Sequence, residues 1–351
     1  HRAHPEAERG GRRLAVLAGL PFALAAAATL SLGMGAVAVR PAQVVAILAA
    51  HAGIDVGVPY TDAQAAVLWA IRLPRVLLAV LVGAALAASG AALQGVFRNP
   101  LADPGIIGVS SGAAVGAVAV IVGGVVAFGS ASVPVAAFAG ALVAALSVYA
   151  LARQGGRTEV VTLVLCGVAV NAIAGAAIGS ATFLADDAQL RSLVFWSLGS
   201  LGGATWKSLG AAAPFLVAGT LALTRFGRPL NLLALGEREA RHLGLRTERA
   251  RLSVITLAAL TTGAAVAVSG IVGFVGLVVP HLVRLVTGPD HRVVLVASAV
   301  GGALALVLAD LAARTLAVPA ELPLGVVSGA AGGPFFLWLL HRTRRAQGGW
   351  A

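Results

Sequence analysis

The chain has 351 residues, of which 59% are hydrophobic and only 11% are charged, whereas a typical soluble domain is about 25% charged. Its 25 basic and 14 acidic residues give a formal net charge of +11. A nucleic-acid-binding protein would gather this charge on one solvated face around a soluble core, but here the basic residues stand between long apolar runs. The composition therefore excludes a nucleic-acid partner and indicates an all-α protein that crosses a lipid bilayer many times.

Apolar runs of about 20 residues predict membrane-spanning helices. The first run, 14–39, has no evident cleavage site, so we expect a span and not a signal peptide. The second run, 76–97, follows a polar loop that holds Asp55 and Asp62. The uncharged stretch 104–152 is long enough for two further spans, with a break at its central cluster of Gly, Ser and Pro.

The remaining runs complete a set of ten spans. We expect the fifth span at 160–185, and within 192–224 a short helical piece followed by the sixth span. The run 252–283 is too long for one span, and Arg-rich segments flank it on both sides, which indicates that both of its ends are cytoplasmic. It therefore crosses and returns, turning at the glycines of 270–276. The last two spans are 293–309 and 322–340.

An even number of spans places both termini on one side of the membrane, and both termini are basic. Because cytoplasmic segments collect Arg and Lys, we expect residues 1–13 and 342–351 to be cytoplasmic tails. The whole chain, 1–351, then forms one transmembrane domain.

A charged segment, 229–246, lies between the sixth and seventh predicted spans on the cytoplasmic side. Gly236 and Gly244 bracket a stretch in which Glu237 precedes Arg241 by four residues, a spacing that supports a helix. One interpretation is an ordinary positively charged loop, which needs arginines but no order. The other interpretation is a short amphipathic helix to which a cytoplasmic partner binds.

Several kinds of chemistry have no support in the sequence. A phosphate-binding loop needs Gly before its lysine, but the only lysine, Lys207, follows Trp206. The single cysteine, Cys166, cannot complete a metal site, and Asp310 pairs first with Arg314 four residues later. Residues 108–112 (GVSSG) match a serine-nucleophile pattern with His281 as a conceivable base, although glycines spaced by four favour helix packing at Ser110 instead.

Four segments resemble one family of membrane proteins. They are IRLPRVLLAVLVGAALAASGAALQGVFRNPLADPGIIGVSSGAA (71–114), LALGEREARHLGL (233–245), GFVGLVVPHLVRL (273–285), and DHRVVL through ELPLGVVSGAAGGPFFLWLL (290–340). They are similar to the FecCD-type permeases of ABC importers for haem, ferric siderophores and cobalamin. The resemblance implies a type II permease with ten spans per subunit in the bacterial inner membrane. It also implies that the chain is not an enzyme and works as a homodimer with two ATPase subunits, which bind ATP and Mg, and a periplasmic binding protein.

The resemblance also assigns roles to particular residues. The ATPase-coupling helix maps onto Gly236, Glu237, Arg238, Glu239, Ala240, Arg241, Leu243 and Gly244, and the cytoplasmic gate onto Asn99, Leu101, Val160 and Val161. Valines at 160 and 161 depart from the small hydroxylated residues of the cobalamin member. The resemblance implies no metal ligands, no catalytic residues and no permanently bound cofactor.

Three arginines, Arg72, Arg75 and Arg314, fall at the outer surface in the predicted topology, where positive charge is not favoured. Snorkelling and local pairing, for example of Arg314 with Asp310, are one explanation. The resemblance implies another, a basic rim that receives acidic residues of the binding protein. For the substrate, ADPGIIGVSSGAA (102–114) and DDAQLRSLVFWSLGSLGG (186–203) look most like haem permeases, with a ferric siderophore or cobalamin as alternatives.

Overall fold

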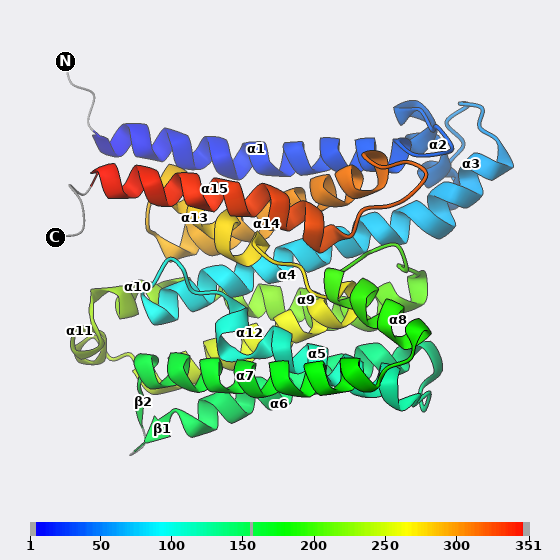
Figure 1. Ribbon diagram of the computed structural model, residues 1–351. Helices are drawn as coiled ribbons and strands as arrows, with labels where there is room; N and C mark the ends of the chain where they lie inside the picture. The colour runs from blue at the N-terminus through cyan, green and yellow to red at the C-terminus, as the bar shows by residue number, and fades with distance from the viewer. Residues whose placement is uncertain (1–4, 155–156, 347–351) are drawn as a thin grey trace.

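The computed structural model describes residues 5–154 and 157–346, which fold into a bundle of antiparallel helices (Figure 1). The long helices are α1 (Pro5–Gly33), α4 (Leu73–Phe97), α5 (Val109–Gly123), α6 (Ser132–Leu151), α7 (Val160–Leu184), α9 (Trp206–Thr224), α12 (Thr247–Ser269), α13 (Val275–Thr287), α14 (His291–Thr315) and α15 (Leu324–Ala346). The shorter helices are α2 (Pro41–His51), α3 (Asp62–Val67), α8 (Asp187–Leu198), α10 (Gly227–Leu235) and α11 (Glu237–His242). The remaining elements are a π-helical turn, η1 (Leu68–Arg72), two 3₁₀ turns, η2 (Pro104–Ile107) and η3 (Gly129–Ala131), and a hairpin of β1 (Arg153–Gln154) and β2 (Arg157–Thr158).

In the described part of the chain, 7 helical segments are long and apolar enough to cross a membrane: α1, the continuous α3–η1–α4, η3–α6, α7, α9, α12 and α14. The helices α5 and α13 and the apolar part of α15 are shorter and also lie along the bundle (Figure 1). Together these helices correspond to the ten predicted spans. The fold class, an all-α polytopic membrane protein, is therefore confirmed, and the two-residue strands add only a small hairpin.

Helix α4 forms the centre of the bundle. It packs against α14, α12, α9 and α13, and 78% of its most apolar window is buried. Small residues permit this close packing: a side chain at Gly83 would collide with the backbone of Gly302, and one at Gly90 would collide with the backbone of Gly276. Helix α4 therefore touches the backbones of α14 and α13 directly.

The turn inside the long apolar run 252–283 is confirmed. Helix α12 ends at Ser269, and Gly270 follows with a φ of 67° that favours glycine. The Ser200 amide donates to the Ser269 carbonyl at 2.8 Å, and the Leu324 amide donates to the Gly199 carbonyl at 2.9 Å. Backbone hydrogen bonds thus connect the loops before α9, α13 and α15 to one another.

The prediction of a polar loop before the second span is partly wrong, because this segment contains the two helices α2 and α3. Pro41 starts α2, where its fixed φ is favourable. Val44 and Ile47 of α2 are buried against Leu32 and Leu68 in a small separate core. Asp55 lies in the connection from α2 to α3, and Asp62 is the first residue of α3.

The two ends of the bundle carry different elements. The start of α1, the end of α15, the β1–β2 hairpin, α10 and α11 lie at one end, and α2, α3 and α8 lie at the other (Figure 1). Helix α1 begins at Pro5 and α15 extends to Ala346, so the described parts of the two predicted tails continue the terminal helices. Their placement in the cytoplasm stays a prediction.

Candidate functional sites at the two ends of the bundle

The charged segment 229–246 forms two short helices joined at Gly236. Gly236 has a φ of 127° and Gly244 a φ of 85°, so both predicted boundaries lie where glycine is required. Arg241 and Glu237 are 3.9 Å apart, as the spacing of four predicted, and Glu237 also lies 3.6 Å from Arg251 of α12. The segment is therefore ordered, and the interpretation as an unstructured loop is wrong.

This segment exposes apolar side chains at the end of the bundle. Leu235 is 63% and Leu243 is 62% exposed, whereas Ala240 between them is fully buried and anchors α11. The charged Arg238 and Glu239 are exposed beside these leucines. An apolar pair rimmed by charges is the composition of a protein-interaction surface.

Polar contacts that the sequence did not reveal fix α10 in place. The Asn231 side chain donates to Asp290 at 2.7 Å and accepts from the His291 amide at 2.8 Å. Burial alone would raise the pKa of Asp290, but hydrogen bonds from Asn231 and Arg292 hold this pKa below its ordinary value. The ionised Asp290 therefore holds α10 against the start of α14 through these hydrogen bonds.

A second cluster ties the hairpin before α7 to α12. The Arg251 guanidinium donates to the Thr158 carbonyl at 2.7 Å and lies 3.3 Å from Glu248. Glu248 in turn accepts from the hydroxyls of Thr158 and Tyr149. Because Arg251 also faces Glu237, one buried arginine links α11, α12 and the hairpin that leads into α7.

The predicted gate residues lie on elements that pack against each other. Arg98 leaves α4 with a φ of 49°, and the Asn99 side chain accepts from the Leu101 amide at 2.9 Å. The same connection continues into η2, whose Gly105 carbonyl accepts from Asn171 of α7 at 3.1 Å. Val160 and Val161 are the first residues of α7, and Leu101 and Val161 are 42% and 70% exposed. Their role as a gate stays a prediction.

The three arginines of the predicted basic rim are largely buried in the described chain. Arg72 is 5% exposed and donates to the carbonyls of Leu32, Gly33 and Val37, while Arg314 donates to Ser31 and Met34. The last carbonyls of a helix lack intrahelical partners, and these two arginines supply donors to the end of α1.

Arg75 is also buried, and the sequence did not reveal its partners. It is 7% exposed, lies 2.9 Å from both Asp310 and Glu321, and bonds Glu321 through two nitrogens. Arg314 lies 3.5 Å from Asp310, so the predicted local pair is confirmed. Docking of a binding protein at these residues stays a prediction, and a partner would meet guanidinium groups that are already bonded within the chain.

The glycines around Ser110 pack a helix, as their spacing predicted. A side chain at Gly112 would collide with the Gly140 carbonyl of α6, and one at Gly116 would collide with the Ala136 carbonyl. Ser110 is on α5, which packs against α6 and α7, whereas His281 is on α13, which packs against α4 and α14. The helix contacts thus follow the packing interpretation and not the catalytic one.

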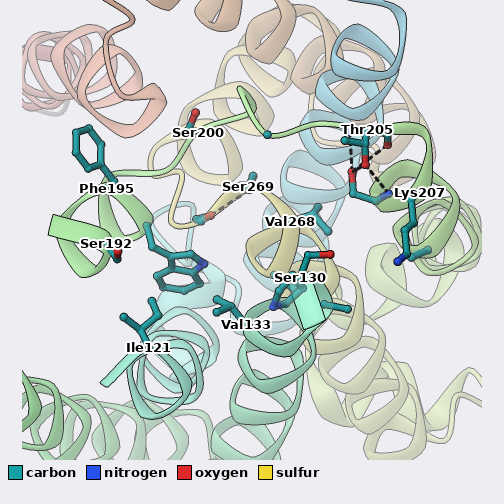
Figure 2. A pocket seen from close by; sticks show the side chains of 18 residues that line it. Ile121, Ser130, Val133, Ser192, Phe195, Ser200, Thr205, Lys207, Val268 and Ser269 are labelled. Carbon is teal, nitrogen blue, oxygen red and sulfur yellow. Dashed lines mark hydrogen bonds between the residues drawn. The ribbon is translucent and has the colours of Figure 1, made fainter. Parts of the chain in front are cut away.

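At the end opposite α11, a cavity of about 710 Å³ lies between α5, α6, α8, α9 and α12 (Figure 2). The sequence did not predict it, because its walls come from segments that are far apart in the chain. Its side chains include Ile121, Ser130, Phe195, Trp196 and Lys207.

Comparisons with known proteins agree with this architecture. Residues 23–342 match the model of the FecCD transport family. The chain is 47% identical to the hemin transport system permease protein HmuU of Yersinia pestis, over 80% of this chain and 84% of that protein. It is 48% identical to the cobalamin import system permease protein BtuC of Halobacterium salinarum, over 84% of this chain and 78% of that protein.

A solved structure shares the fold over nearly the whole chain. It is described as an inward-facing conformation of an ABC transporter, and it aligns with a TM-score of 0.80 and 33% identity over 93% of this chain and 99% of that one. Both the sequence and the arrangement of helices therefore point to the same group of proteins. The chain belongs to the FecCD transport family, and it is a multi-pass permease subunit of an ABC transporter.

Proposed function

We propose that this chain is the membrane-spanning subunit of an ATP-driven importer that moves haem from the periplasm to the cytoplasm across the bacterial inner membrane. It works as a homodimer with two cytoplasmic ATPase subunits and a periplasmic substrate-binding protein. The observation that carries this proposal is the ordered segment 229–246, whose exposed leucines form a surface for a partner beside a cluster of arginines. Arginines favour the cytoplasmic side, where an ATPase is found.

The energy for transport comes from that partner. The only lysine, Lys207, lacks the preceding glycine of a phosphate-binding loop, so the ATPase subunits bind ATP and Mg. The permease itself is not catalytic, in keeping with its family. A serine hydrolase at Ser110 is not proposed, because the glycines on its helix pack against α6.

A movement of α11 is transmitted to the gate residues through the contacts of Arg251. This arginine contacts Glu237 of α11 and the Thr158 carbonyl, and Thr158 lies two residues before Val160, the first residue of α7. A shift of α11 against its ATPase therefore changes the position of the start of α7. Val160 and Val161 act there as a gate together with Asn99 and Leu101.

Segments 102–114 and 186–203, which look most like haem permeases, favour haem as the substrate, and the 47% identity to the hemin permease of Yersinia pestis is consistent with it. Cobalamin is the second candidate, since the cobalamin permease of Halobacterium salinarum is 48% identical. Ferric siderophores are a further alternative.

Growth of a deletion strain tests the substrate. The strain lacking this gene is starved of iron and supplied with haem or with ferric siderophores as the only iron source, and its growth is also tested where it depends on imported cobalamin. We expect growth to fail on haem alone, and the intact gene to restore it. Failure only on siderophore iron, or only where growth depends on cobalamin, would overturn the assignment to haem.

A further inference from the structure

The cavity of about 710 Å³ at the end opposite α11 has the size of a site for a small ligand, which ordinarily measures about 300–1,000 Å³. It is an open pocket bordered by the last residues of α5 and α12, by η3 and the first residues of α6 and α9, and by one side of α8. Helix α8 packs closely against only α5 and α15 among the described helices. The cavity therefore lies between α8 and the first turns of α9.

The lining of the cavity combines apolar side chains with several hydroxyl groups and a single cation. Phe195 and Trp196 of α8 and Ile121, Val133 and Val268 supply apolar walls. Lys207 is the only charged residue among the described residues that line it. Figure 2 shows Phe195 on one side of the cavity and Lys207 on the other, so one ligand could contact an aromatic ring and an ammonium group.

The hydroxyl groups near Lys207 already have partners. Thr205 and Ser208 cap the start of α9, with the Ser208 amide donating to Thr205 at 3.1 Å and the Thr205 amide donating to Ser208 at 2.9 Å. The Ser200 hydroxyl accepts from the Gly202 amide at 3.0 Å. The ammonium group of Lys207 forms no ion pair with any described carboxylate. It is therefore the charged group of this wall that can pair with a ligand.

The position of Lys207 also favours an anion. It is the second residue of α9, and the N-terminus of a helix disfavours positive charge and favours negative charge. This lysine, the only one in the chain, thus stands where a cation is least stable without a counter-ion. A bound carboxylate would pair with the ammonium group and with the helix dipole together.

We propose that this cavity is a holding site for an apolar ring ligand that carries a carboxylate, with the carboxylate on Lys207 and the ring against Phe195 and Trp196. This inference rests on the proposed import of an iron porphyrin, whose ring is flat and apolar and whose edge carries carboxylates. The ligand stops here on the outer side of the membrane before it crosses.

The test measures binding of protoporphyrin IX and of its dimethyl ester to the transporter with its ATPase subunits, in nanodiscs of zwitterionic lipid. Both probes lack metal, so iron coordination plays no part. We expect Lys207→Gln to weaken binding of the free acid about tenfold and to leave binding of the ester unchanged. Lys207→Arg should restore the affinity for the acid. The matched control is Arg191→Gln, which removes an exposed cation of α8 that does not line the cavity, and it should change neither probe.

Unchanged binding of the acid by Lys207→Gln, or an equal loss in Arg191→Gln, would overturn the proposal. A repeat with anionic phospholipid in the nanodiscs decides the source of the anion. If this lipid displaces the porphyrin from the wild type, but no longer changes binding in Lys207→Gln, the cavity is a lipid site and the assignment to substrate is wrong. If porphyrin binding depends on Lys207 but the deletion strain grows normally on haem, the cavity is still a ligand-binding site and the proposed transport of haem is wrong.

Discussion

Asp310 holds two arginines at the end of the bundle opposite α11. It is 1% exposed and lies 2.9 Å from Arg75 and 3.5 Å from Arg314. Two buried cations are costly unless a buried carboxylate and its hydrogen bonds compensate their charge. Glu321 contributes a second carboxylate to Arg75, but its side chain is 46% exposed. The stability of this end therefore depends mainly on Asp310.

We expect Asp310→Asn to lower the free energy of unfolding by about 3–5 kcal/mol, because it leaves buried cations uncompensated. Glu321→Gln should cost about 1 kcal/mol or less, since exposed ion pairs contribute little. Thermal unfolding of the purified protein in detergent measures both, with the exposed Asp187→Asn as a control. Equal melting temperatures for the three variants would show that the cluster does not stabilise the fold.

The sequence predicted the pair of Arg314 and Asp310, because four residues on one helix are neighbours. It could not predict the contacts of Arg75, since 235 residues separate Arg75 from Asp310 and only the packing of α4 on α14 brings them together. The predicted topology placed the three arginines at the outer surface, where snorkelling with local pairing and a basic rim were the two explanations. The topology did not reveal that the unpaired carbonyls at the end of α1 need donors.

Among the helices, α11 is short but well defined. Its glycine boundaries and its Glu237–Arg241 pair were predictable, because both follow from local rules of helix formation. The division of the segment into α10 and α11 was not, since Gly236 bends the chain after α10, whose position depends on its packing against α14 and α4. Helix α2 was missed for a similar reason, because its buried side needs α1 and η1 beside it.

Replacing Leu243 and Arg241 by alanine should weaken binding of the ATPase subunits about tenfold or more, since an apolar contact and a rim charge are both removed. Binding of the ATPase to the purified permease measures the effect. Leu221→Ala is the control, because Leu221 is 57% exposed, close to the 62% of Leu243, but lies on α9. ATPase binding as tight as in the wild type would remove the evidence for a coupling surface.

Arg251→Gln should reduce transport for each ATP hydrolysed by roughly fivefold or more, the usual range of a coupling free energy, while ATPase binding stays unchanged. The substitution breaks the contacts that join α11 to the hairpin before α7. Uptake and hydrolysis are measured together in proteoliposomes. Arg249→Gln, which removes a neighbouring exposed arginine, serves as the comparison. Equal losses of transport in both variants would mean that transport depends on positive charge in this region and not on the contacts of Arg251 with Glu237 and Thr158.

The molecule as a whole has two dissimilar ends, one with exposed leucines and arginines and one with buried ion pairs and a cavity. The sequence predicted the number and order of the spans, because apolar length and charge are properties of the chain itself. It could not predict the cavity, whose walls come from five separate helices. The residues that line it carry no common motif.

Labelling with a membrane-impermeant maleimide tests the orientation. In a Cys166→Ser background, Arg238→Cys should react only after the cells are opened, because α11 faces the cytoplasm in the proposed topology. Asp55→Cys, at the opposite end, should react in intact spheroplasts. The reverse pattern would invert the orientation and exclude import by the proposed arrangement of partners.

The contacts of α4 with α14 and α13 have a consequence for how this sequence can vary. Gly83 and Gly90 meet the backbones of Gly302 and Gly276, where no added side chain fits. Every missense change in a glycine codon adds at least a methyl group, so no single substitution at Gly83 or Gly90 is conservative. A saturation mutagenesis library selected for uptake should therefore be depleted of all 19 alternatives at both positions, while exposed positions of α7 such as Ile173 and Phe183 accept many apolar residues.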